Sequence, residues 1–142
     1  MNFVVEHIGL AAVNPAVLKD WYARVLGARV LHATESDPGS FYLELPGGLH
    51  LEIYPGDFTF HGTRDHSCAG WRHLALRVDS LEAARDHLAG LGVGFTEPER
   101  TEGHGCRALS FHDPEGNLLQ LVEPAPAGEA AKPAETAGKS SG

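Results

Sequence analysis

The amino-acid sequence predicts an α+β fold in which a strand–helix–three-strand unit occurs twice in tandem. A shift of the chain along itself by 66 residues places His7 on His73, within similar apolar segments of strand character. A shift of 68 residues places Leu51 on Leu119. A match at a nearly constant offset indicates a duplicated unit, and the two-residue difference is an ordinary change in loop length. We therefore expect two tandem βαβββ modules.

Length and composition agree with a single domain. A chain of 142 residues, of which 42% are hydrophobic, is long enough to bury one core. We interpret residues 1–124 as that domain, with modules at 3–55 and 71–124 and a connection at 56–70. Residues 125–142 are rich in Ala, Pro, Gly, Glu and Lys, which predicts a disordered tail.

The charge and the cysteine count exclude several partners. A net charge of −8 argues against nucleic acid and anionic membranes. The chain has no long apolar segment and no basic-then-apolar leader, so we expect neither a membrane span nor a signal peptide. Two cysteines do not make a disulfide framework, which favours the cytoplasm.

The elements of the first module follow from periodicity and turn residues. An alternating segment predicts a strand at 3–10. Asn14 and Pro15 are typical of a helix start, apolar residues recur at helical spacing after them, and Gly27 is a typical stop. Three further strands are expected at 28–34, 40–45 and 48–54, the last two joined by a turn at 46–48.

The second module repeats this plan. A strand at 71–78 leads to a helix near 80–90, for which Ser80 is the expected N-cap. Strands are expected near 93–97, 106–112 and 117–123, with a turn at 113–116 between the last two.

Strand alternation assigns the two faces of each module. Leu51 and Ile53 need apolar partners, so they face the helix, and Glu52 faces the opposite, inner side. The same alternation turns the first-strand histidines inward. Four polar residues then occupy matching inner positions, and a pseudo-twofold relation between the modules would bring them together: His7, Glu52, His73 and Gln120.

Two imidazoles and a carboxylate with open positions are typical of a divalent-metal site. A single histidine in a strand is more often a core residue, but two histidines at equivalent positions favour a ligand role. A polar pocket without metal remains the alternative. Other residues on the inner face are candidates to bind a substrate: Tyr42, His50, Tyr54, His104, Ser110 and His112.

Five segments resemble the vicinal oxygen chelate superfamily, also called the glyoxalase/bleomycin resistance/dioxygenase superfamily: 7–10 (HIGL), 21–27 (WYARVLG), 51–53 (LEI), 72–79 (RHLALRVD) and 111–123 (FHDPEGNLLQLVE). The resemblance implies a curved, cup-shaped mixed sheet with helices outside and one divalent metal inside. It also implies a homodimer, with ligands from the first and last strand of each module. Family members usually have Glu where this chain has Gln120; Glu123 lies three residues on and faces the helices unless a β-bulge inverts the strand.

The resemblance implies a glyoxalase-like metalloenzyme that binds Zn, Ni, Co, Mn or Fe. The ion would chelate adjacent oxygens of a small substrate during a lyase or isomerase proton transfer, with Glu52 as ligand and catalytic carboxylate. Ala11 and Gly56 replace the Arg and Asn of glutathione-dependent members, so another substrate is expected. The alternatives are an Fe(II) extradiol-type dioxygenase and a non-catalytic drug-binding protein of the bleomycin resistance type.

Overall fold

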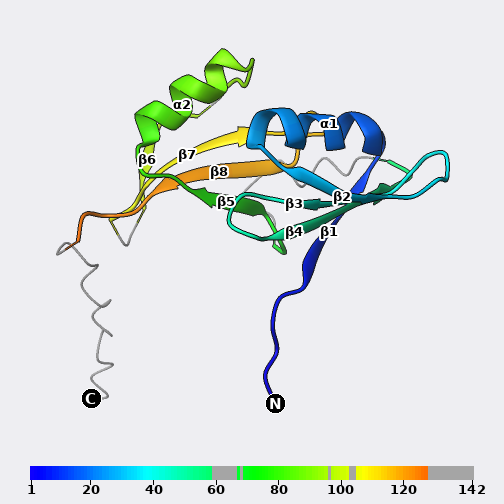
Figure 1. Ribbon diagram of the computed structural model, residues 1–142. Coiled ribbons are helices and arrows are strands. Elements are labelled where there is room, and N and C mark those ends of the chain that lie inside the picture. Colours follow the sequence, from blue (N-terminus) through cyan, green and yellow to red (C-terminus); the bar gives the residue numbers. More distant parts are fainter. Residues whose placement is uncertain (59–66, 68, 96, 103–104, 128–142) are drawn as a thin grey trace, which may run out of the picture.

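A computed structural model describes residues 1–58, 67, 69–95, 97–102 and 105–127 (Figure 1). His104, most of the connection between the modules and the tail from residue 128 lie outside this part of the chain.

The two modules form two four-stranded mixed sheets with one helix each (Figure 1). The first sheet has the order β1-β4-β3-β2 and the second the order β5-β8-β7-β6. In each sheet the first and last strands of the module are parallel and the other pairs are antiparallel. The predicted α+β fold of two βαβββ modules is therefore confirmed. The elements are β1 (His7–Ala12), α1 (Pro15–Leu26), β2 (Arg29–Ala33), β3 (Phe41–Glu44), β4 (His50–Pro55), β5 (His73–Arg77), α2 (Leu81–Gly90), β6 (Arg100–Thr101), β7 (Arg107–His112) and β8 (Leu118–Glu123).

Both helices begin at the predicted capping residues. The Asn14 side chain accepts a hydrogen bond from the Val17 amide, and Ser80 does the same for the Ala83 amide. Helix α1 ends at Gly27, whose φ of 71° is the left-handed conformation that glycine adopts without steric cost. Neither helix of the described residues is long and apolar enough to span a membrane.

The prediction of a strand at 93–97 is wrong. Its described residues are not in a strand, and the short β6 forms later in the chain. Val93 and Phe95 are half-buried and still pack against the core, so their apolar character reflects packing of an irregular segment. The first strand also begins later than expected, at His7, and residues 1–6 are exposed.

One hydrophobic core joins the two modules. It includes α1 and β4 residues of the first module and α2, β7 and β8 residues of the second. Phe111 is fully buried, and its ring lies 6.5 Å from that of Trp21 and 5.7 Å from that of Phe95. The modules therefore pack directly against each other through the helix side of their sheets.

The turn between β7 and β8 makes polar contacts with α1 and with the two residues that precede it. The buried Tyr22 hydroxyl donates to Asp113 Oδ2 at 3.0 Å. Glu115 accepts hydrogen bonds from the amides of Val13 and Asn14, at 2.9 Å and 2.6 Å. These bonds fix the second module against α1.

Candidate functional site

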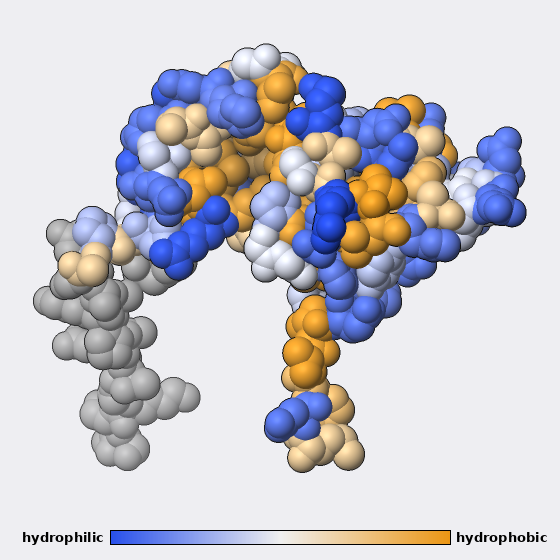
Figure 2. Space-filling model, viewed as in Figure 1, coloured by the Kyte–Doolittle hydropathy of each residue, from blue (hydrophilic) through white to orange (hydrophobic). Residues whose placement is uncertain are grey.

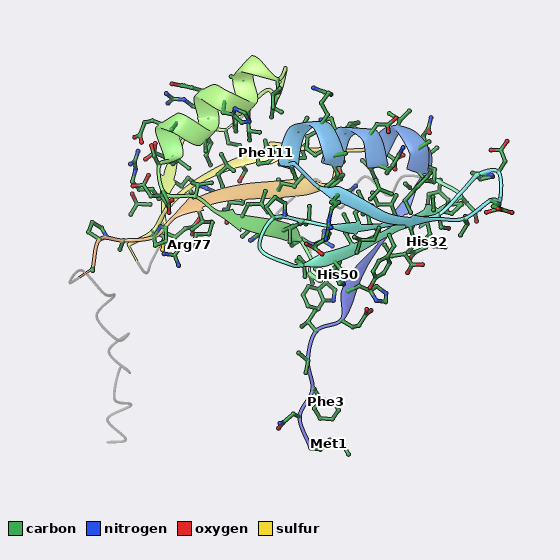
Figure 3. All side chains as sticks on the ribbon, in the orientation of Figure 1. Met1, Phe3, His32, His50, Arg77 and Phe111 are labelled. Carbon is green, nitrogen blue, oxygen red and sulfur yellow. The ribbon has the colours of Figure 1, made fainter. Side chains whose placement is uncertain are left out.

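The faces of β4 follow the predicted alternation. Leu51 and Ile53 are buried under α1, whereas Glu52 is half-buried on the opposite face. Strand β1 runs parallel to β4, with His7 in register with His50. His7 and His50 therefore lie on neighbouring strands at the same level. Figure 3 shows the His50 side chain on the side of the sheet away from the helices.

The predicted ligands of the first module, His7 and Glu52, lie close together, and we call this pair the first half-site. His7 Nε2 lies 3.4 Å from Glu52 Oε2. The Tyr42 ring lies 5.7 Å from the His7 ring and 5.4 Å from the His50 ring. His50 Nε2 in turn lies 3.6 Å from Glu44 Oε2. This half of the predicted site is thus a contiguous polar group on β1, β3 and β4.

Glu6 also belongs to this group, although the sequence did not indicate it. One carboxylate oxygen accepts a hydrogen bond from the Tyr42 hydroxyl at 2.6 Å, and the other contacts His7 Nδ1. Adjacent residues in a strand face opposite sides, so a strand from residue 3 would turn Glu6 away from His7. Because β1 begins only at His7, Glu6 lies outside the alternation and reaches the inner side.

These contacts perturb the pKa values of all three groups. The hydrogen bond to Glu6 raises the pKa of His7, and the hydrogen bonds from Tyr42 and His7 lower the pKa of Glu6. The hydrogen bond to Glu6 also raises the pKa of Tyr42 to about 12, because ionisation would place a second negative charge beside the carboxylate.

The predicted ligands of the second module, His73 on β5 and Gln120 on β8, are called the second half-site. Both line a cavity of about 400 Å³. Gln120 is only 5% exposed and lies between Ala75 and Ser110 on the neighbouring strands. The remaining residues that line the cavity are Ala75, Arg77, Glu102, Val122 and Pro124.

Two other predicted residues lie along the inner face of β7. Ser110 is 4% exposed and is in register with Gln120. His112 is in register with Leu118, and its Nε2 is buried without a hydrogen-bond partner in the described part of the chain. Such an atom costs free energy unless a further partner reaches it. Tyr54 lies at the end of β4 and is 39% exposed.

Glu123 is engaged on the helix side of β8. Its carboxylate accepts hydrogen bonds from the Leu81 amide at 2.7 Å and from Arg107 Nη1 at 3.3 Å. The pairing of β8 with β5 and β7 runs without a bulge through this strand. Strand alternation therefore holds to its end, and Glu123 stabilises the start of α2, where a negative charge is favourable.

The four predicted ligands lie as two pairs. Within the described residues, no group of three or more His, Cys, Asp or Glu side chains is placed to hold a metal ion. Each half-site offers two donors: an imidazole with a carboxylate, and an imidazole with an amide oxygen.

Comparisons with known proteins place the chain in a family. The family model for the Glyoxalase/Bleomycin resistance protein/Dioxygenase superfamily matches residues 4–121. The uncharacterized protein YwkD of Bacillus subtilis is 34% identical, and the match covers 84% of this chain and 95% of YwkD. A lactoylglutathione lyase of Pseudomonas aeruginosa is 27% identical, over 90% of this chain and 86% of the enzyme.

Solved structures agree with these matches. The crystal structure of a glyoxalase family protein from Enterococcus faecalis has a TM-score of 0.71 and 28% identity, over 84% of this chain and 97% of the other. A relative named for a different activity also matches: a biphenyl-2,3-diol 1,2-dioxygenase of Rhodococcus globerulus is 28% identical, over 81% of this chain and 60% of the enzyme. The chain belongs to the glyoxalase/bleomycin resistance protein/dioxygenase superfamily.

Proposed function

We propose that this protein is a glyoxalase-like metalloenzyme that promotes a lyase or isomerase proton transfer on a small substrate with two adjacent oxygens. The observation that supports it most is the pairing of His7 Nε2 with Glu52 Oε2 at 3.4 Å on the inner face. His73 and Gln120 occupy the equivalent positions of the second module, where both line one cavity.

The donor set fits a divalent transition metal. Two imidazole nitrogens, one carboxylate and one amide oxygen suit Zn, Ni, Co, Mn or Fe. The contact of Glu6 with His7 Nδ1 fits the same role, because a carboxylate at one ring nitrogen directs the other toward a metal. In His7 that other nitrogen is the one beside Glu52.

The side chains around His7 have separate roles in this proposal. When bound, the ion would hold adjacent substrate oxygens and stabilise the negative charge that develops on them. Glu52, half-buried next to His7, would take a proton from the substrate carbon and return it. Tyr42, His50 and Tyr54 would contact the substrate on the exposed side of this half-site.

We further propose that a homodimer completes each metal site by joining the first half-site of one copy to the second half-site of its partner. Strands β1 and β5, which contain the two histidines, are edge strands in the described sheets. Exposed apolar side chains immediately precede both strands: Phe3, Val4 and Val5, which are 91%, 87% and 75% exposed, and Trp71, which is 96% exposed. Figure 2 shows the apolar N-terminal segment projecting from the body. An unpaired sheet edge can pair with another chain, and exposed apolar segments often mark interaction surfaces, so both features support the dimer.

The substrate is not expected to be a glutathione adduct. The likeness to lactoylglutathione lyase supports the glyoxalase type of chemistry. However, Ala11 and Gly56 lack the side chains expected to hold glutathione, and a side chain at Gly56 would meet Ala11 Cβ at 3.0 Å. This end of the first half-site is therefore closely packed backbone and offers no polar groups from these two residues.

Metal analysis of untagged protein tests the proposal. We expect wild-type protein to retain one divalent ion per site and the double variant His7→Ala/His73→Ala to lose it. The control is His32→Ala/His87→Ala, which removes two histidines from β2 and α2 and should leave the metal content unchanged. Equal metal in wild type and His7→Ala/His73→Ala would refute the site. Selective retention of iron would favour the dioxygenase alternative.

A further inference from the structure

Arg77 places a cation in the cavity of the second half-site. We infer that Arg77 binds a carboxylate or phosphate group at the far end of the substrate, and so selects extended anionic substrates. This inference rests on the proposed function, because it takes His73 and Gln120 as the end of the cavity where the substrate oxygens are chelated.

Strand β5 turns Arg77 to the same side as the histidine. His73, Ala75 and Arg77 alternate along β5, and all three line the cavity with Gln120. Figure 3 shows the Arg77 side chain on the side of the sheet away from α2. The cavity is thus lined at one end by the second half-site and farther along β5 by a guanidinium.

Arg77 is free to bind a ligand. Among the arginines of the described residues, it alone makes no hydrogen bond or ion pair. Glu102 lines the same cavity, but no ion pair within 4.0 Å joins it to Arg77 in the described residues. The planar fork of an arginine matches the two oxygens of a carboxylate or phosphate, which makes it a selective anion-binding group.

The position of Arg77 also limits the shape of the substrate. Four residues along a strand separate it from His73, which is about 13 Å between Cα atoms at the usual rise. The long arginine side chain spans part of this distance, and the substrate must span the rest. The equivalent position in the first module is Ala11, so the cation occurs in one module only. The expected substrate has chelating oxygens at one end and an oxyanion several bonds away.

A matched pair of probes tests this inference by calorimetry on manganese-loaded protein. The probes are 2-oxoadipate and 2-oxohexanoate, which share a chelating 2-oxo acid and chain length but differ in the distal carboxylate. We expect wild type to bind 2-oxoadipate about tenfold more tightly. Arg77→Gln should remove that preference without changing 2-oxohexanoate binding, and Arg77→Lys should keep part of it. Arg85→Gln, which removes the same charge from α2, should keep all of it.

The outcomes separate this inference from the proposed function. Equal affinity of wild type for both probes, or an equal loss in Arg77→Gln and Arg85→Gln, would overturn the role of Arg77 even if metal binds. If wild type binds no metal, the proposed function fails, and the same titrations of metal-free protein still decide whether Arg77 supplies the preference. Competition by inorganic phosphate against 2-oxoadipate then shows whether the site accepts phosphate as well as carboxylate.

Discussion

Removal of the Tyr22 hydroxyl tests how firmly the two modules are joined. Tyr22 is 2% exposed and Asp113 is 5% exposed, and their side chains are 3.0 Å apart. This burial keeps water from replacing the bond, and it also raises the pKa values of both groups. Tyr22→Phe keeps the ring and removes one hydrogen bond to a buried carboxylate, which costs about 1.5–3 kcal/mol.

In Tyr22→Phe the Asp113 carboxylate is not left unpaired, which keeps the loss of stability within this range. It still accepts hydrogen bonds from the Glu115 amide and from the amide and side chain of Asn117, at 3.0, 2.9 and 2.8 Å. For a chain of this size the expected loss lowers Tm by roughly 6–12 °C. Calorimetric melting of the single variants Tyr22→Phe and Tyr54→Phe supplies the comparison. Tyr54→Phe should melt like wild type, since Tyr54 makes no hydrogen bond in the described residues. Equal Tm values for Tyr22→Phe and Tyr54→Phe would refute the stabilising role of this contact.

Three further predictions follow from particular contacts. Arg107→Gln should lower stability at neutral pH and flatten its acid dependence. Hydrogen bonds from Arg107 hold the pKa values of Glu82 and Glu99 below their usual 4.5, so these carboxylates stabilise the fold above that pH and lose the effect as the pH falls through the lowered values. Urea unfolding at a series of pH values measures this, and parallel curves for the two proteins would contradict it. Gln120→Glu should tighten binding of a divalent ion because a charged oxygen replaces a neutral one, while Glu123→Gln should lower stability and leave metal affinity unchanged. If Glu123→Gln lost metal affinity while Gln120→Glu left it unchanged, the strand register assigned to β8 would be wrong. The protein should not turn over the methylglyoxal–glutathione adduct, and a rate similar to that of a glyoxalase would contradict the assignment of the glutathione-binding positions.

Local patterns in the sequence predicted most of the fold. The period-2 alternation around Leu51 and Ile53 assigned the faces of β4, because successive side chains in a strand point to opposite faces of the sheet. The same alternation placed Glu123 on the helix side of β8, where it contacts the start of α2. Capping residues located the start of both helices, because an N-cap side chain accepts a hydrogen bond from a backbone amide in the first turn and needs no distant partner.

Features that depend on packing were not predicted. Val93 and Phe95 have strand-like apolar character, but they are half-buried against the core without joining a sheet. Glu6 reaches His7 only because β1 begins at that histidine, and strand ends are not determined by periodicity. Arg77 follows the same alternation as His73, so it could have been identified as a residue of the inner face. The separation of the two half-sites reflects how the modules pack, which the repeat alone does not specify.

Subunit mixing tests the central claim that two copies complete each metal site. His7→Ala and His73→Ala proteins, each expected to lack metal, are unfolded together, refolded and analysed for bound metal. A shared site predicts that mixed dimers regain one intact site, which combines His7 of one copy with His73 of the other. Random pairing then restores about a quarter of the wild-type metal content. Sites formed within single chains would remain broken, so a mixture without metal, beside a metal-loaded wild type, would contradict the shared site.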